Sequence, residues 1–151
     1  MIIEDRKGFV AKMQKRIQES VVEDAILFGG RLQGSVLSLE EAIDTQPYIE
    51  EASQGRLKFS SLFIGGSIRA LSKSGKELIF LHTHPGQKNL HFSETDRKFE
   101  KDILNLTLEL GYQGSVTFLV ASACNVIGRS YCGGEEEEVC FFSRHQIIKK
   151  F

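Results

Sequence analysis

Two histidines separated by one residue follow directly on a segment that is apolar after its first residue, Glu77 to Leu81, and this feature constrains the fold most. A short apolar run with this boundary is typical of a buried β-strand. Because side chains alternate along a strand, His82 and His84 are expected on the same side of its end. Both imidazole rings can therefore reach a single metal ion.

A helix is predicted after the loop that follows these histidines. Ser93 is a good N-cap, and apolar residues then recur at helical spacing up to Gly111, at Phe99, Ile103, Leu106 and Leu110. Asp96 lies in the first turn, where its carboxylate is expected to point back toward the strand end. Two imidazoles and one carboxylate would leave the fourth position of a tetrahedral zinc ion open for water, as in catalytic zinc sites.

The rest of the chain predicts alternating strands and helices, and therefore one α/β domain over residues 1–151 with a mixed β-sheet flanked by helices. Helices are predicted over about 4–19 and 60–74. Strands are predicted over 25–28, closed by Gly29-Gly30, and around 36–39 as its hairpin partner, then over 116–121, 125–132 and 138–143. Residues 44–58 are expected to form a surface loop, and Gly133-Gly134 with Glu135 to Glu138 a solvated turn; contact with a basic partner is the alternative reading of these acids.

The composition excludes several functional classes. Hydrophobic residues make up 41% and charged residues 26%, as in an ordinary globular protein, and the net charge of -1 gives no basic footprint for nucleic acid. No apolar run approaches the roughly 18–20 residues that cross a membrane. The N-terminus mixes acids and bases, unlike a signal peptide, so a cytoplasmic protein is expected.

Three cysteines, Cys124, Cys132 and Cys140, are spaced eight apart. Metal sites prefer tighter pairs, so this spacing is a weak ligand signal. Free thiols in a reducing compartment are expected, with a single disulfide as the alternative.

The succession of strand, His82-Thr-His-Pro85, short loop, Ser93-x-x-Asp96 and amphipathic helix resembles the metal signature of the JAMM (MPN-plus) metalloproteases. That family also has a glutamate near the start of an early strand, followed by an apolar run and a glycine. Glu23 fits this pattern, with the glycine match at Gly30, and the order of elements agrees over most of the chain. In one departure, eight residues separate His84 from Ser93 where the family pattern has seven, which lengthens the loop.

The resemblance implies a zinc metalloprotease with the JAB/MPN, cytidine-deaminase-like architecture. It implies that His82, His84 and Asp96 bind Zn²⁺, that Glu23 is the general base and acid, and that Ser93 donates a hydrogen bond to the oxyanion. Three other glutamates are alternatives for the base, Glu19, Glu40 and Glu41, but only Glu23 precedes an apolar strand that ends in glycine. The remaining histidines, His91 and His145, are expected at the surface.

The substrate that the resemblance implies is a ubiquitin-like or sulfur-carrier protein, processed at its C-terminus. An extended tail can add to a sheet edge, and the loops at 44–58 and 86–92 are expected to wall that groove. Cleavage of an isopeptide conjugate and trimming of the carrier tail are both open. The alternatives are a non-catalytic MPN-type scaffold and a DNA-repair-associated relative, for which no basic patch is present. No feature of the sequence sets the oligomeric state.

Overall fold

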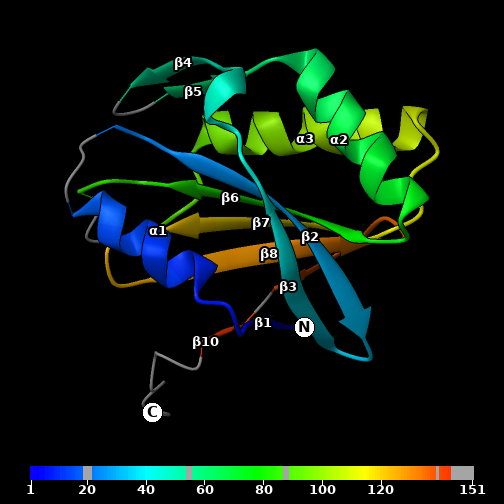
Figure 1. The fold of residues 1–151 in the computed structure, drawn as a ribbon, viewed down its shortest axis with the longest axis horizontal. Coiled ribbons are helices and arrows are strands. Elements are labelled where there is room, and N and C mark those ends of the chain that lie inside the picture. Colours follow the sequence, from blue (N-terminus) through cyan, green and yellow to red (C-terminus); the bar gives the residue numbers. More distant parts are fainter. Residues whose placement is uncertain (19–21, 54–55, 87–88, 139, 144–151) are drawn as a thin grey trace.

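An eight-stranded mixed β-sheet forms the centre of the protein, with the strand order β10-β1-β3-β2-β6-β7-β8-β9 (Figure 1). The computed structural model describes residues 1–18, 22–53, 56–86, 89–138 and 140–143. The strands of this sheet are β1 (Ile2–Asp5), β2 (Ala25–Gln33), β3 (Val36–Ile43), β6 (Glu77–Thr83), β7 (Val116–Ala121), β8 (Val126–Cys132), β9 (Glu135–Glu138) and β10 (Cys140–Ser143). A separate hairpin consists of β4 (Ile49–Ser53) and β5 (Arg56–Phe59), preceded by the 3-10 turn η1 (Gln46–Tyr48).

Three α-helices cover the two faces of the sheet in the part of the chain that is described. They are α1 (Phe9–Ile17), α2 (Ser61–Lys73) and α3 (Glu94–Glu109), with α2 and α3 on one face and α1 on the other (Figure 1). The fold is therefore a single α/β domain. Strands β6 and β7 are parallel and α3 connects them, which places the N-terminus of α3 close to the end of β6.

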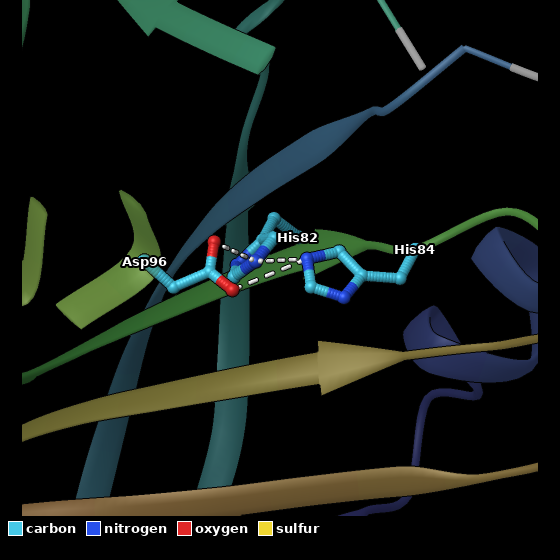
Figure 2. A group of neighbouring side chains, drawn as sticks. All are labelled: His82, His84 and Asp96. Atoms are coloured by element: carbon cyan, nitrogen blue, oxygen red, sulfur yellow. Dashed lines mark hydrogen bonds and ion pairs between the residues drawn. The ribbon is translucent and has the colours of Figure 1, made fainter. Parts of the chain in front are cut away.

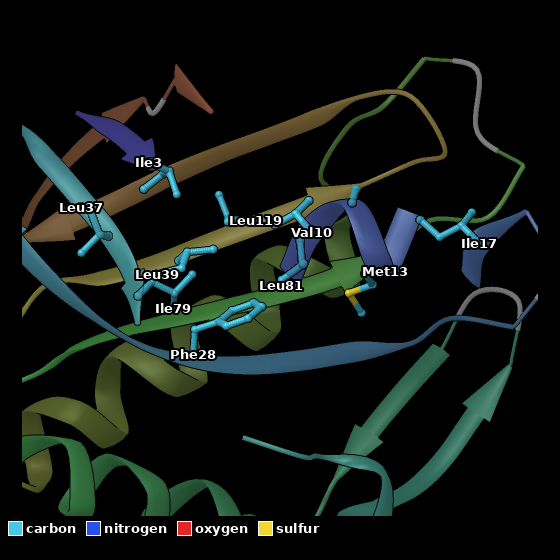
Figure 3. Close-up of a cluster of buried hydrophobic side chains, with 11 residues drawn as sticks. Ile3, Val10, Met13, Ile17, Phe28, Leu37, Leu39, Ile79, Leu81 and Leu119 are labelled. Atoms are coloured by element: carbon cyan, nitrogen blue, oxygen red, sulfur yellow. The ribbon is translucent and has the colours of Figure 1, made fainter. Parts of the chain in front are cut away.

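Two hydrophobic cores result from the alternation of side chains in the sheet. Ile79 and Leu81 of β6 face α1, where they pack with Phe28, Val10 and Met13 (Figure 3). The alternate β6 residues belong to the second core, under α2 and α3, which contains Leu27, Ile64, Ile68, Leu71, Leu78, Phe80, Ile103, Tyr112, Val116 and Phe118. Because His82 and His84 continue the row of Leu78 and Phe80, the sheet directs them toward the α3 face.

The sheet is curled so that its two edge strands approach each other. β9 pairs with β8, and β10 pairs with β1, yet one residue separates the two strands in the sequence. β10 consequently also comes close to β8.

The predicted helix over about 4–19 was wrong at its start, because residues 2–5 form β1 and α1 begins at Phe9. β1 lies between β3 and β10 and is parallel to both. Gly8 turns the chain with φ 70°, a left-handed conformation that glycine adopts readily. The fully buried carboxylate of Asp5 then accepts hydrogen bonds from the N–H groups of Phe9 and Val10, at 3.0 and 2.9 Å, and takes the place of an N-cap.

The glycine pair after Phe28 does not end its strand, since β2 continues to Gln33 with an irregular register between Gly29 and Gly30. A Cβ atom on Gly29 would lie 2.7 Å from the Leu71 side chain. Gly29 therefore permits close packing of the sheet against α2.

Two further expectations were wrong. The predicted loop at 44–58 contains the β4–β5 hairpin and η1. The acids after Gly133-Gly134 form β9, paired with β8, so the turn consists of the two glycines, both with positive φ. The side chains of Glu135, Glu136 and Glu137 are exposed, and an edge strand accepts such acids because its backbone still pairs.

Several elements confirm the predictions, since α2, α3, β6, β7 and β8 lie where the patterns place them and β2 and β3 form the expected antiparallel hairpin. The strand predicted over 138–143 is correct only for β10 at Cys140–Ser143, because Glu138 belongs to β9, which pairs with a different strand. The thiols of Cys124 and Cys132 are free and exposed; the side chain of Cys140 lies outside the described part of the structure. No helix among the described residues has the length and apolar character needed to cross a membrane.

Candidate metal centre

His82, His84 and Asp96 converge at the end of β6 (Figure 2). The Nε2 atoms of the two histidines are 3.1 Å apart, and the Asp96 carboxylate places one oxygen 3.0 Å from His82 Nε2 and the other 3.3 Å from His84 Nε2. The strand alternation supplies the two rings, and the first turn of α3 supplies the carboxylate. All three residues thus lie together, as the sequence predicted.

This donor set fits a zinc ion. Two ligands at about 2.0–2.1 Å from a tetrahedral ion lie roughly 3.3 Å from each other. The observed separations of 3.0, 3.1 and 3.3 Å are close to this value. Two nitrogens and one carboxylate oxygen are ligands that zinc accepts, and three protein ligands leave a further position for water or substrate.

Asp96 is held in place by a capping box at the start of α3. Its carboxylate accepts the Ser93 N–H at 2.6 Å, and Ser93 Oγ accepts the Asp96 N–H at 3.1 Å. The predicted role of Ser93 as an N-cap is therefore confirmed. The Ser93 hydroxyl serves here as an acceptor, so its own hydrogen remains available for donation.

Glu23 reaches the same centre from the segment before β2. Ala25 is paired with His82 in the antiparallel register, so two further steps bring Glu23 opposite His84. The Glu23 Oε1 atom lies 3.9 Å from His84 Nε2, and the side chain is only 9% exposed. Two of the alternative candidates for the base, Glu40 and Glu41, lie in β3 and form ion pairs with Arg31 and Lys76 instead. Glu19 lies outside the described residues.

Thr83 fixes this segment and was not singled out by the sequence. The Asp24 N–H donates to Thr83 Oγ1 at 2.9 Å, and the Thr83 N–H donates to the Asp24 carbonyl oxygen at 2.9 Å. Thr83 is almost fully buried. Thr83, between the two histidines, therefore holds Asp24, the residue next to Glu23. This contact depends on the register between β2 and β6.

The two carboxyl groups of the centre have opposite pKa shifts. Burial raises the pKa of Glu23 above its ordinary value, and the positive potential of His82 and His84 reduces this rise only in part. Burial also acts to raise the pKa of Asp96. The hydrogen bonds that its carboxylate accepts from the two histidines and from the Ser93 N–H outweigh this effect and hold the pKa below its usual range. Of the two carboxyl groups, Glu23 has the raised pKa, whereas the lowered pKa of Asp96 favours its anionic form.

A cavity of about 210 Å³ opens beside Glu23. Its walls are apolar side chains of α1 and the β4–β5 hairpin, including Met13, Ile17 and Ile49, with Arg16 and Thr83 as polar members. The hairpin found at 49–59 therefore forms one side of a hollow next to the candidate base.

The remaining histidines lie apart from this centre or outside the described residues. His91 is exposed, and its Nδ1 atom is 3.1 Å from the Asn89 carbonyl oxygen. This confirms the expected surface position. His145 lies outside the described residues.

No protein-family model matches this sequence, and no curated protein matches it. Among solved structures, the chain is similar to the solution structure of protein DSY2949 from Desulfitobacterium hafniense, with a TM-score of 0.54 and 17% sequence identity. The similarity covers 95% of this chain and 94% of that chain. At this level of identity it concerns the fold alone.

Proposed function

We propose that this protein is a zinc-dependent amide hydrolase, a compact member of the JAMM metalloproteases with the JAB/MPN architecture. The observation that carries the proposal is the convergence of two imidazole nitrogens and the Asp96 carboxylate, with Glu23 3.9 Å from His84. An ordinary cluster of hydrogen-bonded histidines does not need a second buried carboxylate beside it, whereas a hydrolytic centre needs a base.

In this proposal the residues have separate roles. His82, His84 and Asp96 would hold the zinc ion, which would supply Lewis-acid chemistry and lower the pKa of water to about 7. Glu23 accepts a proton from the attacking water and returns it to the leaving amine, a task suited to a carboxyl group whose pKa is raised by burial. The Ser93 hydroxyl donates a hydrogen bond to the carbonyl oxygen as negative charge develops there.

The proposed substrate is a ubiquitin-like or sulfur-carrier protein with an extended C-terminal tail. The cavity beside Glu23 offers apolar contacts for a tail residue next to the cleaved bond. The β4–β5 hairpin supplies a neighbouring strand edge with which an extended backbone can pair. The free, exposed thiols of Cys124 and Cys132 fit a reducing, cytoplasmic location.

Metal content and hydrolysis together test the proposal. The protein is purified, stripped of metal, reconstituted with zinc and incubated with a carrier protein bearing either a peptide extension or a lysine isopeptide conjugate. We expect one zinc ion per chain and cleavage of at least one substrate form after the carrier tail.

Two aspartates of α3 provide a matched comparison. Asp96→Ala should lose both zinc and activity, whereas Asp102→Ala, which removes an exposed carboxylate of the same helix, should lose neither. A chain that takes up no zinc, or an Asp96→Ala variant that binds zinc as tightly as the unaltered protein, would contradict the proposal and favour a non-catalytic scaffold.

A further inference from the structure

A buried ionic cluster lies about one helical turn of α3 after Asp96 and is not used by the proposed chemistry. The Arg129 guanidinium donates from Nη2 to Glu100 Oε1 at 3.1 Å, and the Tyr131 hydroxyl donates to Glu100 Oε2 at 3.1 Å. Glu100 is 4% exposed and Arg129 7%. Burial raises the pKa of Glu100, which reflects the cost of removing this carboxylate from water. Such pairs often add little net stability, so the cluster calls for another explanation.

Arg129 also contacts the segment that enters α3. Its guanidinium carbon lies 4.1 Å from the centroid of the Phe92 ring, within the range of a cation–π contact. Phe92 immediately precedes Ser93, the residue that caps α3 and binds the Asp96 backbone. Arg129 Nε is buried and has no hydrogen-bond partner among the described residues. The contacts with Glu100, Phe92 and Glu136 therefore set the orientation of the guanidinium, although they leave its Nε–H donor unpaired.

The spacing of these residues brackets Asp96. Phe92, Asp96 and Glu100 are four residues apart, and α3 begins at Glu94, so Asp96 lies between two points that both contact Arg129. Strand β8, which carries Arg129, is paired with β7, and β7 is paired with β6, which carries His82. The sheet thus connects the arginine to the histidines in a fixed register.

We propose that Arg129 is a positioning residue that sets the place of the first turn of α3, and therefore of Asp96, relative to His82 and His84. The inference rests on the proposed function only where it treats Asp96 as a metal ligand. A planar guanidinium can pair with Glu100 along its edge while its face covers Phe92, which a lysine ammonium cannot do. Residues that orient metal ligands commonly change metal affinity about 10–100-fold when they are replaced.

Three variants separate positioning from stability. Phe92→Leu removes the aromatic face but leaves the ion pair. Arg129→Lys keeps the charge without the planar group. The double replacement Glu100→Leu with Arg129→Met removes both charges and retains apolar volume, a change that is often neutral for stability. Asp5→Asn is the control, because it weakens the cap of α1 on the opposite face of the sheet.

Two measurements are made on each variant. Amide hydrogen exchange of Ser93 and Asp96 is measured in the metal-free protein relative to that of Leu119 in β7, and the zinc Kd is measured by competition with a chelator. We expect all three variants to lose relative protection at both amides and to raise the zinc Kd about 10–100-fold. Asp5→Asn should lower the stability and change neither quantity.

Unchanged exchange and zinc Kd in the double variant would overturn the inference and leave the cluster as a structural ion pair. If the double variant does not fold, Phe92→Leu gives the decision, since it leaves Glu100 and Arg129 paired. A failure of the unaltered protein to bind zinc would contradict the proposed function instead. The exchange measurement in the metal-free protein would still decide whether Arg129 positions α3.

Discussion

Glu23 Oε1 lies 3.9 Å from His84 Nε2, across the junction where the chain enters β2 beside the end of β6. The carboxylate belongs to neither the strand nor the helix that carry the other members of the centre. Its position follows from the antiparallel register, in which residue 25 pairs with residue 82. Because Glu23 lies in a different segment from the three candidate ligands, it can be replaced without changing the segments that carry those ligands.

We expect Glu23→Gln to bind zinc and to lose most of its turnover. Glutamine is close in size to glutamate but cannot accept a proton, and removal of a general base commonly lowers kcat about 10²–10⁴-fold. Zinc content and kcat on the cleaved substrate form are measured together. Retention of most of the rate would show that Glu23 is not the base, whereas loss of zinc would show that it is needed for metal binding.

Thr83→Val should lower kcat more than it lowers zinc affinity. The replacement removes the buried hydroxyl that accepts the Asp24 N–H, at an expected cost of about 1–3 kcal/mol of unfolding free energy. It leaves the backbone bond from Thr83 to the Asp24 carbonyl as the remaining link to the residue next to Glu23. Denaturant unfolding, zinc competition and kcat are compared with those of Thr117→Val. Thr117 is a fully buried threonine of β7 that pairs with Ser130. Equal losses of kcat in both variants would contradict a specific effect on Glu23.

The protein should lose stability between pH 10 and about 12 in part through Tyr131. Burial and the nearby Glu100 carboxylate raise the pKa of this tyrosine from 10.0 to about 12. Its stabilising contribution is therefore complete below pH 10 and is lost as the pH rises through the folded value. Denaturant unfolding from pH 9 to 12 should show a steeper loss for the unaltered protein than for Tyr131→Phe. Parallel curves for the two proteins would exclude this contribution.

Filling the cavity beside Glu23 should weaken substrate binding. Ala52 lines the cavity from the hairpin, and Ala52→Trp is expected to raise KM about tenfold or more while zinc stays bound, since loss of one apolar contact has an effect of that order. Ala70→Trp, on the exposed side of α2, is the control and should leave KM unchanged. A similar KM for both variants would place the substrate tail elsewhere.

Local patterns in the sequence predicted much of the α3 face. The N-cap at Ser93 and the apolar spacing after it set the helix, and strand alternation set the directions of His82 and His84. These features depend on neighbours within a few residues. By contrast, β1 is a strand because it pairs with β3 and β10, which are distant in sequence, so the local pattern at residues 2–5 did not indicate it.

The candidate site was predictable to a similar extent. Glu23 could be chosen because an apolar strand follows it. The contribution of Thr83 depends on the register between β2 and β6, and that of Arg129 on the pairing of β8 with β7, neither of which the sequence specifies locally. The same reason explains why the acidic segment 135–138 was predicted to be a turn. Its composition is typical of a solvated turn, but its backbone pairs with β8, which the local sequence does not indicate.

The insertion of β1 between β3 and β10 has a consequence for synthesis of the chain. β1 is synthesised long before its partner β10, so the curled sheet can be completed only once β10 has also been made. Until then one side of β1 offers unpaired backbone groups to other chains. We expect the nascent chain to need protection by a chaperone over this interval, and a circular permutation that brings β1 and β10 together in sequence to shorten it.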